Sequence, residues 1–230
     1  MDNERSNIEE EQRESVYECG MIETKNSKGR INSLSIIGTV EGHSLLPPGT
    51  KTTKYEHVIP HLVAAEEDEE VDGLLVLLNT TGGDVEAGLA IAEMISGMSK
   101  PTVSIVLGGS HSIGVPLAVS CDKSYIVPSA TMTIHPMRIC GVVIGAEQTY
   151  RYFEMMQSRI AEFIVRNSKI SRDELLKLML ATDKIANDVG TILFGEQAVE
   201  KGIIDSVGGL SDAISCLYSL IEEKKTYIEY

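Results

Sequence analysis

Residues 73–79 read Gly-Leu-Leu-Val-Leu-Leu-Asn, so an extended strand over this segment is apolar on both faces. Such a strand has to be covered on both sides, as strands of a parallel sheet are by the helices that connect them. A glycine turn at 80–83, a helical pattern over 84–98 and a second apolar strand over 102–107 follow. This alternation predicts right-handed crossovers and an α/β fold around a mostly parallel sheet.

The remaining elements follow from the same patterns. We expect a buried strand over 31–37, a helix over 55–65, a glycine turn and helix over 108–120, strands over 123–127 and 131–134, helices over 146–167 and from Ser171, a helix and strand over 195–205, and a last helix over 211–223. Ser171 and Glu174 have the spacing of a capping box. The helix over 146–167 carries one apolar stripe, which consists of Phe153, Met156, Ile160, Phe163 and Ile164.

Charge is distributed unevenly along the chain. The 230 residues, 43% of them hydrophobic, are enough for one large core, and the formal net charge is -14. Residues 2–23 contain eight acids and two bases, which gives -6 for this segment and leaves -8 for the rest. We therefore expect a flexible acidic tail over 1–30 and one folded domain over 31–230. The acidic balance argues against nucleic-acid binding, which depends on Lys and Arg.

The sequence gives no sign of a membrane helix, a signal peptide, a disulfide framework or a metal site. No apolar run is long enough for a membrane helix, and the start Met-Asp-Asn-Glu lacks the basic and then apolar pattern of a signal peptide, so we expect a cytoplasmic protein. Cys19, Cys121, Cys140 and Cys216 form no CxxC pair and have no His at ligand spacing. We expect reduced thiols, no metal site and no cofactor.

A serine stands in the turn that follows the second apolar strand. Residues 108–114 read Gly-Gly-Ser-His-Ser-Ile-Gly and lead from that strand into a helix. Ser112 is then at the positive end of a helix dipole, among unpaired N–H groups, where an alkoxide is stabilised. The spacing is not that of a strict Gly-x-Ser-x-Gly elbow. An ordinary glycine turn with Ser112 as helix cap is the alternative.

Two further segments complete a pattern of acyl-transfer chemistry. Residues 79–84, Asn-Thr-Thr-Gly-Gly-Asp, place two glycine N–H groups after the first apolar strand, where they could face an oxyanion or simply form a tight turn. His135 ends a short strand, and Pro136 restricts it to an extended conformation. A structural histidine is the alternative there. An anion-binding turn, a serine at a helix start and a histidine at a strand end, in this order at the carboxyl edge of one parallel sheet, are the parts of acyl-transfer chemistry.

These motifs resemble those of the Clp protease proteolytic subunit family. Residues 79–83 resemble the family's oxyanion turn Asn-Ser-Pro-Gly-Gly, and 108–114 its nucleophile motif Gly-Gln-Ala-Ala-Ser-Met-Gly. Residues 133–136, Thr-Ile-His-Pro, match Met-Ile-His-Gln-Pro with one residue missing, and 196–206 resemble Glu-Ala-Val-Glu-Tyr-Gly-Leu-Val-Asp-Ser. The resemblance covers about 33–207.

The resemblance implies roles for individual residues. Ser112 would be the nucleophile, His135 the general base, and the N–H groups of Gly82 or Gly83 and of Ile113 the oxyanion hole. The family's third catalytic residue, an aspartate, falls on Gly190 when residues are counted back from Ala198. Asp188 is two residues away and Asp183 further, so the third residue is Asp188, Asp183 or neither. Without an orienting group a triad enzyme loses roughly four orders of magnitude in rate.

The resemblance also implies a ClpP/crotonase-like fold of repeated ββα units with a handle helix at about 137–170, along which two heptameric rings stack. Residues 137–145 would pair with an extended peptide substrate. The acidic start and the insertion at 45–55 have no counterpart, which leaves docking of a Clp-type ATPase open. With these differences the chain most resembles the translocation-enhancing branch of ClpP-like proteins, which is linked to protein export.

Three functions follow as hypotheses. The first is a cytoplasmic serine peptidase that acts through an acyl-enzyme on Ser112. The second keeps the fold without catalysis, as an oligomeric scaffold or export factor that binds extended preproteins. The third, a crotonase-type acyl-CoA enzyme, shares the oxyanion turns, but Glu86 is the one carboxylate at a helix start that such chemistry could use, and no basic patch for the nucleotide is visible.

Overall fold

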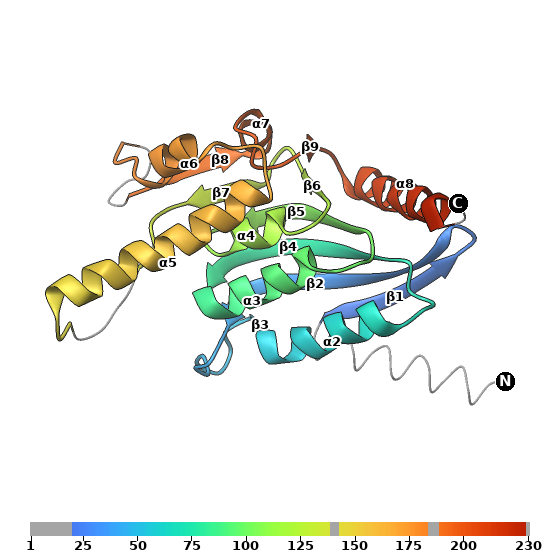
Figure 1. Cartoon of the computed structure of the whole chain (residues 1–230), viewed down its shortest axis with the longest axis horizontal. Coiled ribbons are helices and arrows are strands. Elements are labelled where there is room, and N and C mark those ends of the chain that lie inside the picture. Colours follow the sequence, from blue (N-terminus) through green and yellow to red (C-terminus); the bar gives the residue numbers. More distant parts are fainter. Residues whose placement is uncertain (1–19, 139–142, 184–188, 229–230) are drawn as a thin grey trace.

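The computed structural model describes residues 20–138, 143–183 and 189–228, and the fold is a mixed α/β structure with helices on both sides of one sheet (Figure 1). The strands are β1 Met21–Asn26, β2 Gly29–Glu41, β3 Thr52–Lys54, β4 Gly73–Gly83, β5 Thr102–Ser110, β6 Lys123–Ile126, β7 Thr131–Ile134, β8 Thr191–Phe194 and β9 Ser206–Val207. The helices are α2 Tyr55–Glu67, α3 Val85–Ser96, α4 Gly114–Val119, α5 Ala146–Arg166, α6 Arg172–Met179, α7 Gly195–Glu200 and α8 Leu210–Ile228.

The sheet is mostly parallel, as predicted. Its strand order is β1-β2-β4-β5-β6-β9, and every neighbouring pair in this order is parallel except β1 with β2. The central strand β4 has its Leu74, Val76 and Leu78 side chains fully buried. The prediction of a doubly covered strand at 73–79 is therefore confirmed, although β4 continues four residues further, to Gly83.

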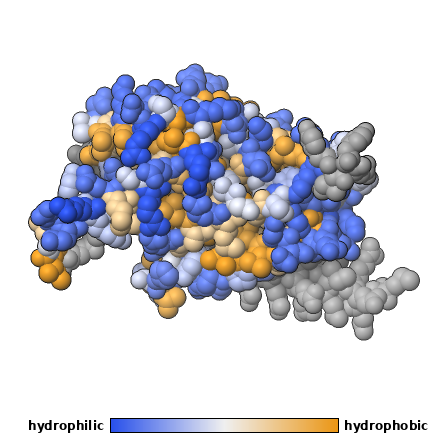
Figure 2. Space-filling view, in the orientation of Figure 1, coloured by the Kyte–Doolittle hydropathy of each residue, from blue (hydrophilic) through white to orange (hydrophobic). Residues whose placement is uncertain are grey.

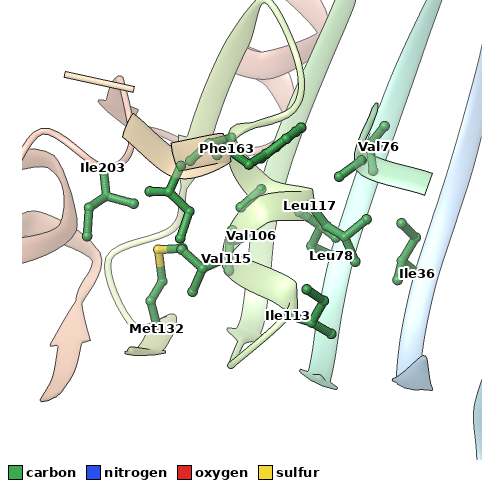
Figure 3. Close-up of a cluster of buried hydrophobic side chains, with 14 of the residues drawn as sticks. Ile36, Val76, Leu78, Val106, Ile113, Val115, Leu117, Met132, Phe163 and Ile203 are labelled. Carbon is green, nitrogen blue, oxygen red and sulfur yellow. The ribbon is translucent and has the colours of Figure 1, made fainter. Parts of the chain in front are cut away.

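Two separate cores hold the sheet between its helices. The larger core packs α2 to α5 against one face, and Val76, Leu78 and Val106 meet Leu117 of α4 there (Figure 3). The smaller core packs α8 against the other face, where Leu75 and Ile105 meet Leu217. Burial of a leucine-sized side chain contributes roughly 1.5–3 kcal/mol, so this double cover fixes the strand ends that carry the candidate site.

A small second layer of strands lies next to the main sheet. Strand β7 joins β5 at a single parallel position, Gly109 with Thr131, and pairs antiparallel with β8 along its whole length. The sequence predicts β7 with its observed bounds but gives no sign of β8, which has only four residues. This pairing places Gly190, just before β8, opposite His135, just after β7.

A regular strand lies before the expected tail boundary at residue 30. Strand β1 occupies 21–26 and forms a hairpin with β2, with Met21 opposite Leu34 and buried. The expectation of a flexible segment up to residue 30 is thus wrong for its last ten residues, because Met21 has a place in the core. The most acidic part of the tail, residues 1–19, lies outside the described residues.

The two halves of α5 have different surroundings. The predicted apolar stripe is confirmed in the second half, where Met156, Ile160, Phe163 and Ile164 are buried against the body. The first half projects past the sheet (Figure 1), and the side chains of Tyr150 and Met155 are 64% and 54% exposed. Hydrophobic residues gather at this free end (Figure 2), next to Ile144, which is 97% exposed.

Candidate active site

Ser112 stands in a strained turn between β5 and α4. With φ of 58° it is the only non-glycine residue with a positive φ in the described part of the chain. The left-handed conformation costs an L-residue roughly 1–2 kcal/mol and persists where neighbouring contacts impose it. Strand β5 and a helix anchored in the core by Val115 and Leu117 hold the two sides of this turn (Figure 3).

Hydrogen bonds on all sides impose this conformation. The Ser112 N–H donates to the Thr133 carbonyl of β7 at 2.9 Å, and the Gly114 N–H donates to the His111 carbonyl at 2.9 Å. The buried Ser110 hydroxyl donates to the Gly114 carbonyl at 2.6 Å and closes the turn from inside. Ser112 therefore lies in a turn that these contacts fix, and it lines a pocket.

The end of β4 lies directly beside Ser112. A methyl group on Gly82 would come within 2.7 Å of the Ser112 Cβ and within 3.4 Å of its Oγ, so only glycine fits there. Gly82 also has φ of 91°, which glycine alone adopts without strain. The structure thus brings Gly82 and Ser112 together, as the resemblance implies.

The N–H groups around Ser112 differ in their availability. The Gly82 N–H donates to the Thr80 hydroxyl at 3.1 Å. The Asp84 N–H donates to Val40 of β2 at 2.9 Å, so alternation along the strand turns the Gly83 N–H away from β2. The Ile113 N–H makes no hydrogen bond within the described residues, and Ile113 and Gly83 both line the pocket in front of Ser112. Gly83 and Ile113 are therefore better candidates for an oxyanion hole than Gly82.

That pocket has a volume of about 240 Å³, and Ser112 and His135 both line it. Val85 and Val115 from α3 and α4, and Ile160 from α5, form part of an apolar wall. Arg138 lines it as a cationic group near His135. The pocket can therefore hold an apolar side chain of a substrate while its reacting carbonyl faces the serine.

The His135 ring is oriented by a main-chain group. Its Nδ1 lies 2.6 Å from the carbonyl oxygen of Pro136. Because a carbonyl oxygen only accepts, Nδ1 is the donor, and in the neutral ring Nε2 keeps the lone pair that a general base needs.

Position 190, where the family's aspartate falls, holds a glycine in the structure. Gly190 lies against His135, where a methyl group would approach the His135 Cβ to 2.8 Å. Asp183 is not among the residues that line the pocket. Asp188 lies outside the described residues, as do residues 139–142 of the expected substrate strand. The catalytic assignment of Asp188 stays a prediction.

His111 and Thr133 also belong to this site, although the sequence did not indicate that they meet. The His111 Nδ1 and the Thr133 hydroxyl are 2.8 Å apart. Burial lowers the pKa of His111, and the neighbouring His135 lowers it further. Thr133 thus contacts both residues of the turn, His111 through its hydroxyl and Ser112 through its carbonyl. Only the lateral position of β7 beside β5 reveals this pairing.

The described residues offer no other chemistry of this kind. They contain no group of three or more His, Cys, Asp or Glu side chains that could hold a metal ion. Burial raises the pKa of the Cys121 thiol to about 12, so it is not a reactive thiolate at neutral pH. No helix among the described residues is long and apolar enough to cross a membrane.

A serine with a positive φ, a histidine whose Nδ1 meets a main-chain carbonyl, and the glycine turn at the end of β4 thus lie around one pocket. The sequence profile of the Clp protease family matches residues 34–210. The chain therefore belongs to the Clp protease family, and its α/β sheet is consistent with that fold.

Two of the similar proteins have different names. The chain is 52% identical to "Translocation-enhancing protein TepA" of Halalkalibacterium halodurans over 198 residues, which cover 86% of this chain and 77% of that protein. It is 28% identical to the "ATP-dependent Clp protease proteolytic subunit" of Leuconostoc citreum over 162 residues, or 65% of this chain and 74% of that protein. The resemblance to the translocation-enhancing branch is thereby confirmed.

Proposed function

We propose that the protein is a serine peptidase that cleaves peptide bonds through an acyl-enzyme on Ser112. The observation that carries this proposal is the left-handed Ser112 at a turn fixed by hydrogen bonds, in one pocket with His135. A glycine turn and helix cap without function would not need a strained non-glycine residue at this point.

In the proposed reaction the Ser112 oxygen attacks the peptide carbonyl carbon, and its proton passes to Nε2 of His135. The N–H groups of Ile113 and Gly83 would donate to the oxyanion that forms. Collapse of the tetrahedral intermediate expels the amine, which takes the proton from His135. Water, deprotonated by the same nitrogen, then hydrolyses the acyl-enzyme and restores Ser112.

Covalent labelling tests the nucleophile. A fluorophosphonate probe reacts with activated serines, so we expect it to label the wild type at Ser112 and not to label Ser112→Ala. Ser110→Ala is unsuitable as a control because the Ser110 hydroxyl closes the turn. Ser129→Ala, in the exposed loop after β6, is a matched control that should label like the wild type. Folded wild-type protein that fails to label would exclude the proposal.

A second candidate function is an export factor that binds extended preproteins without cleaving them. It is favoured by Gly190, which offers no carboxylate to His135, and by the name of the 52% identical relative. The two functions separate in cells: an export factor keeps its full effect on secretion in Ser112→Ala, whereas a peptidase loses it.

Self-assembly into a ring is part of the proposal. The first half of α5 exposes Tyr150, Tyr152 and Met155, a surface that a second copy would cover in a handle arrangement. We expect sedimentation of a species far larger than the 25.0 kDa chain, and dissociation in the double variant Tyr152→Glu with Met155→Glu. A wild-type monomer at micromolar concentration would contradict the assembly. The cytoplasmic location stays a prediction that cell fractionation tests.

A further inference from the structure

The Nδ1 atom of the His135 ring contacts the main chain of the next residue. On the side of Nδ1 the ring donates to the Pro136 carbonyl at 2.6 Å, a contact between neighbouring residues of the chain. Proline fixes its own φ and restricts the preceding His135 to an extended conformation. The carbonyl is therefore held near Nδ1 by local backbone geometry, and it needs no side chain from another element.

Residue 190, which lies opposite His135, has no room for a side chain. A methyl group on Gly190 would lie 2.4 Å from the Ile134 carbonyl oxygen and 2.8 Å from the His135 Cβ. Gly190 also has φ of 132°, a conformation that side-chain-bearing residues rarely adopt. Its N–H donates to the Ala181 carbonyl at 2.7 Å, which fixes the segment in this close position. An orienting side chain therefore cannot begin at residue 190, where the family's aspartate falls.

We propose that the main-chain carbonyl of Pro136 is the group that orients His135, and that no side-chain carboxylate is required. This inference rests on the proposed function of Ser112 and His135. The carbonyl fixes the tautomer with the proton on Nδ1, which is one of the two roles of a triad carboxylate. It cannot fill the other role in full, because a dipole stabilises the imidazolium less than a whole negative charge does. The proposal therefore implies that this site cleaves peptides more slowly than a site with a triad carboxylate.

Two aspartates are the competing groups, and they make the inference testable. If Asp183 or Asp188 orients His135, its conversion to Asn reverses or removes the Nδ1 contact, which costs a Ser-His-Asp protease roughly four orders of magnitude in rate. If the Pro136 carbonyl does so, Asp183→Asn, Asp188→Asn and the double variant keep the labelling rate of Ser112 within about threefold of the wild type. Asp173→Asn, an exposed carboxylate on α6, is the matched control.

A substitution of Pro136 tests the carbonyl itself, because it should lower the labelling rate. Pro136→Gly frees the φ and ψ of the residue that carries the carbonyl, so the contact is no longer held. We expect labelling to fall by about tenfold or more, as for other misplaced catalytic groups. Pro48→Gly, in the exposed loop before β3, controls for the general cost of removing a proline.

Nitrogen NMR of histidine-labelled protein provides a readout that does not depend on activity. The signal of His135, assigned by its loss in His135→Gln, should show the proton on Nδ1 in the wild type and in the double aspartate variant, and a mixture of tautomers in Pro136→Gly. A proton on Nε2 in the wild type, a tautomer change in either aspartate variant, or an unchanged tautomer in Pro136→Gly would each overturn the inference. A wild type that does not label but shows the Nδ1 proton would contradict the proposed function and leave the orienting role of the carbonyl standing.

Discussion

The nucleophile side and the histidine side of the site are built differently. Ser112 is held by hydrogen bonds from three elements, since β5, α4 and β7 all contribute to its turn, and Gly82 of β4 closes it from a fourth. The His135 ring has a local contact with Pro136, and its neighbour across the strands is Gly190. Contacts from distant elements thus hold the serine, whereas the described hydrogen bond of the His135 ring comes from the next residue of the chain.

The largest effect should come from filling the space beside Ser112. Gly82→Ala puts a methyl group 2.7 Å from the Ser112 Cβ and from the His111 carbonyl, at φ of 91°. Strain and overpacking together should cost about 2–4 kcal/mol of unfolding free energy, and Ser112 labelling should fall by about a hundredfold.

Gly49→Ala is the matched control for this variant. Its φ is 92°, but nothing lies within 4 Å of the added methyl group, so only the backbone strain of about 1–2 kcal/mol remains. Equal losses of stability and labelling in the two variants would show that the contact with Ser112 is irrelevant. Chemical denaturation and labelling rates measure both quantities.

A smaller effect should follow when the link between the turn and β7 is cut. Thr133→Val removes the hydroxyl that meets His111 at 2.8 Å and leaves a half-buried ring nitrogen without its partner. The expected cost is about 1–2 kcal/mol, with labelling reduced severalfold because the Ser112 turn shifts relative to His135. Thr131→Val, two residues earlier on the same strand, should change neither quantity much. A Thr133→Val protein as stable and reactive as the wild type would show that the contact with β7 does not hold the Ser112 turn.

The pH dependence of stability should carry a signature of His111. Burial, and then the neighbouring His135, lowers the pKa of His111 below 6.5, so the unfolded chain binds a proton at higher pH than the folded chain. This contribution to stability is complete above pH 6.5 and is lost as the pH falls through the folded pKa. The difference in melting temperature between wild type and His111→Gln should therefore shift in favour of the variant below pH 6.5. A difference that does not change with pH between 5 and 8 would contradict the burial of a neutral ring.

The smallest effect on stability and labelling should come from removal of the ion pairs between α5 and α3. Arg159 pairs with Glu86 at 2.7 Å and Arg166 with Glu93 at 2.8 Å, all with largely exposed side chains. Each pair should contribute about 0.2–1 kcal/mol and lose that contribution at high salt. Arg166→Met should leave Ser112 labelling unchanged. A large loss of labelling would mean that the position of α5 controls the site.

Much of the fold follows from the sequence because apolar strands and helix caps are local signals. The start of β4 at residue 73 and the bounds of β7 and α5 are predicted to within one residue, and Ser171 caps α6 by accepting from the Glu174 N–H at 3.3 Å. The Glu174 carboxylate instead pairs with Lys201, so only half of the capping box forms.

What could not be predicted depends on neighbours far away in the chain. Strand β4 continues through Gly83 because Val40 of β2 accepts from the Asp84 N–H, and β8 exists only because β7 offers an edge. In the expected strand at 203–205, Ile203 and Ile204 are buried in turns, and the strand forms at 206–207 instead. At the site, side-chain types indicate Ser112 and His135, whereas the Pro136 carbonyl is a main-chain group that no pattern of residues reveals.

The central claim, an activated serine at residue 112, is tested most directly by peptide mapping after exposure to a fluorophosphonate. We predict one adduct per chain, on the peptide that contains Ser112, with no adduct in Ser112→Ala and a rate at least about a thousandfold lower in His135→Gln. A folded wild type without an adduct, or an adduct that persists in Ser112→Ala, would contradict the account.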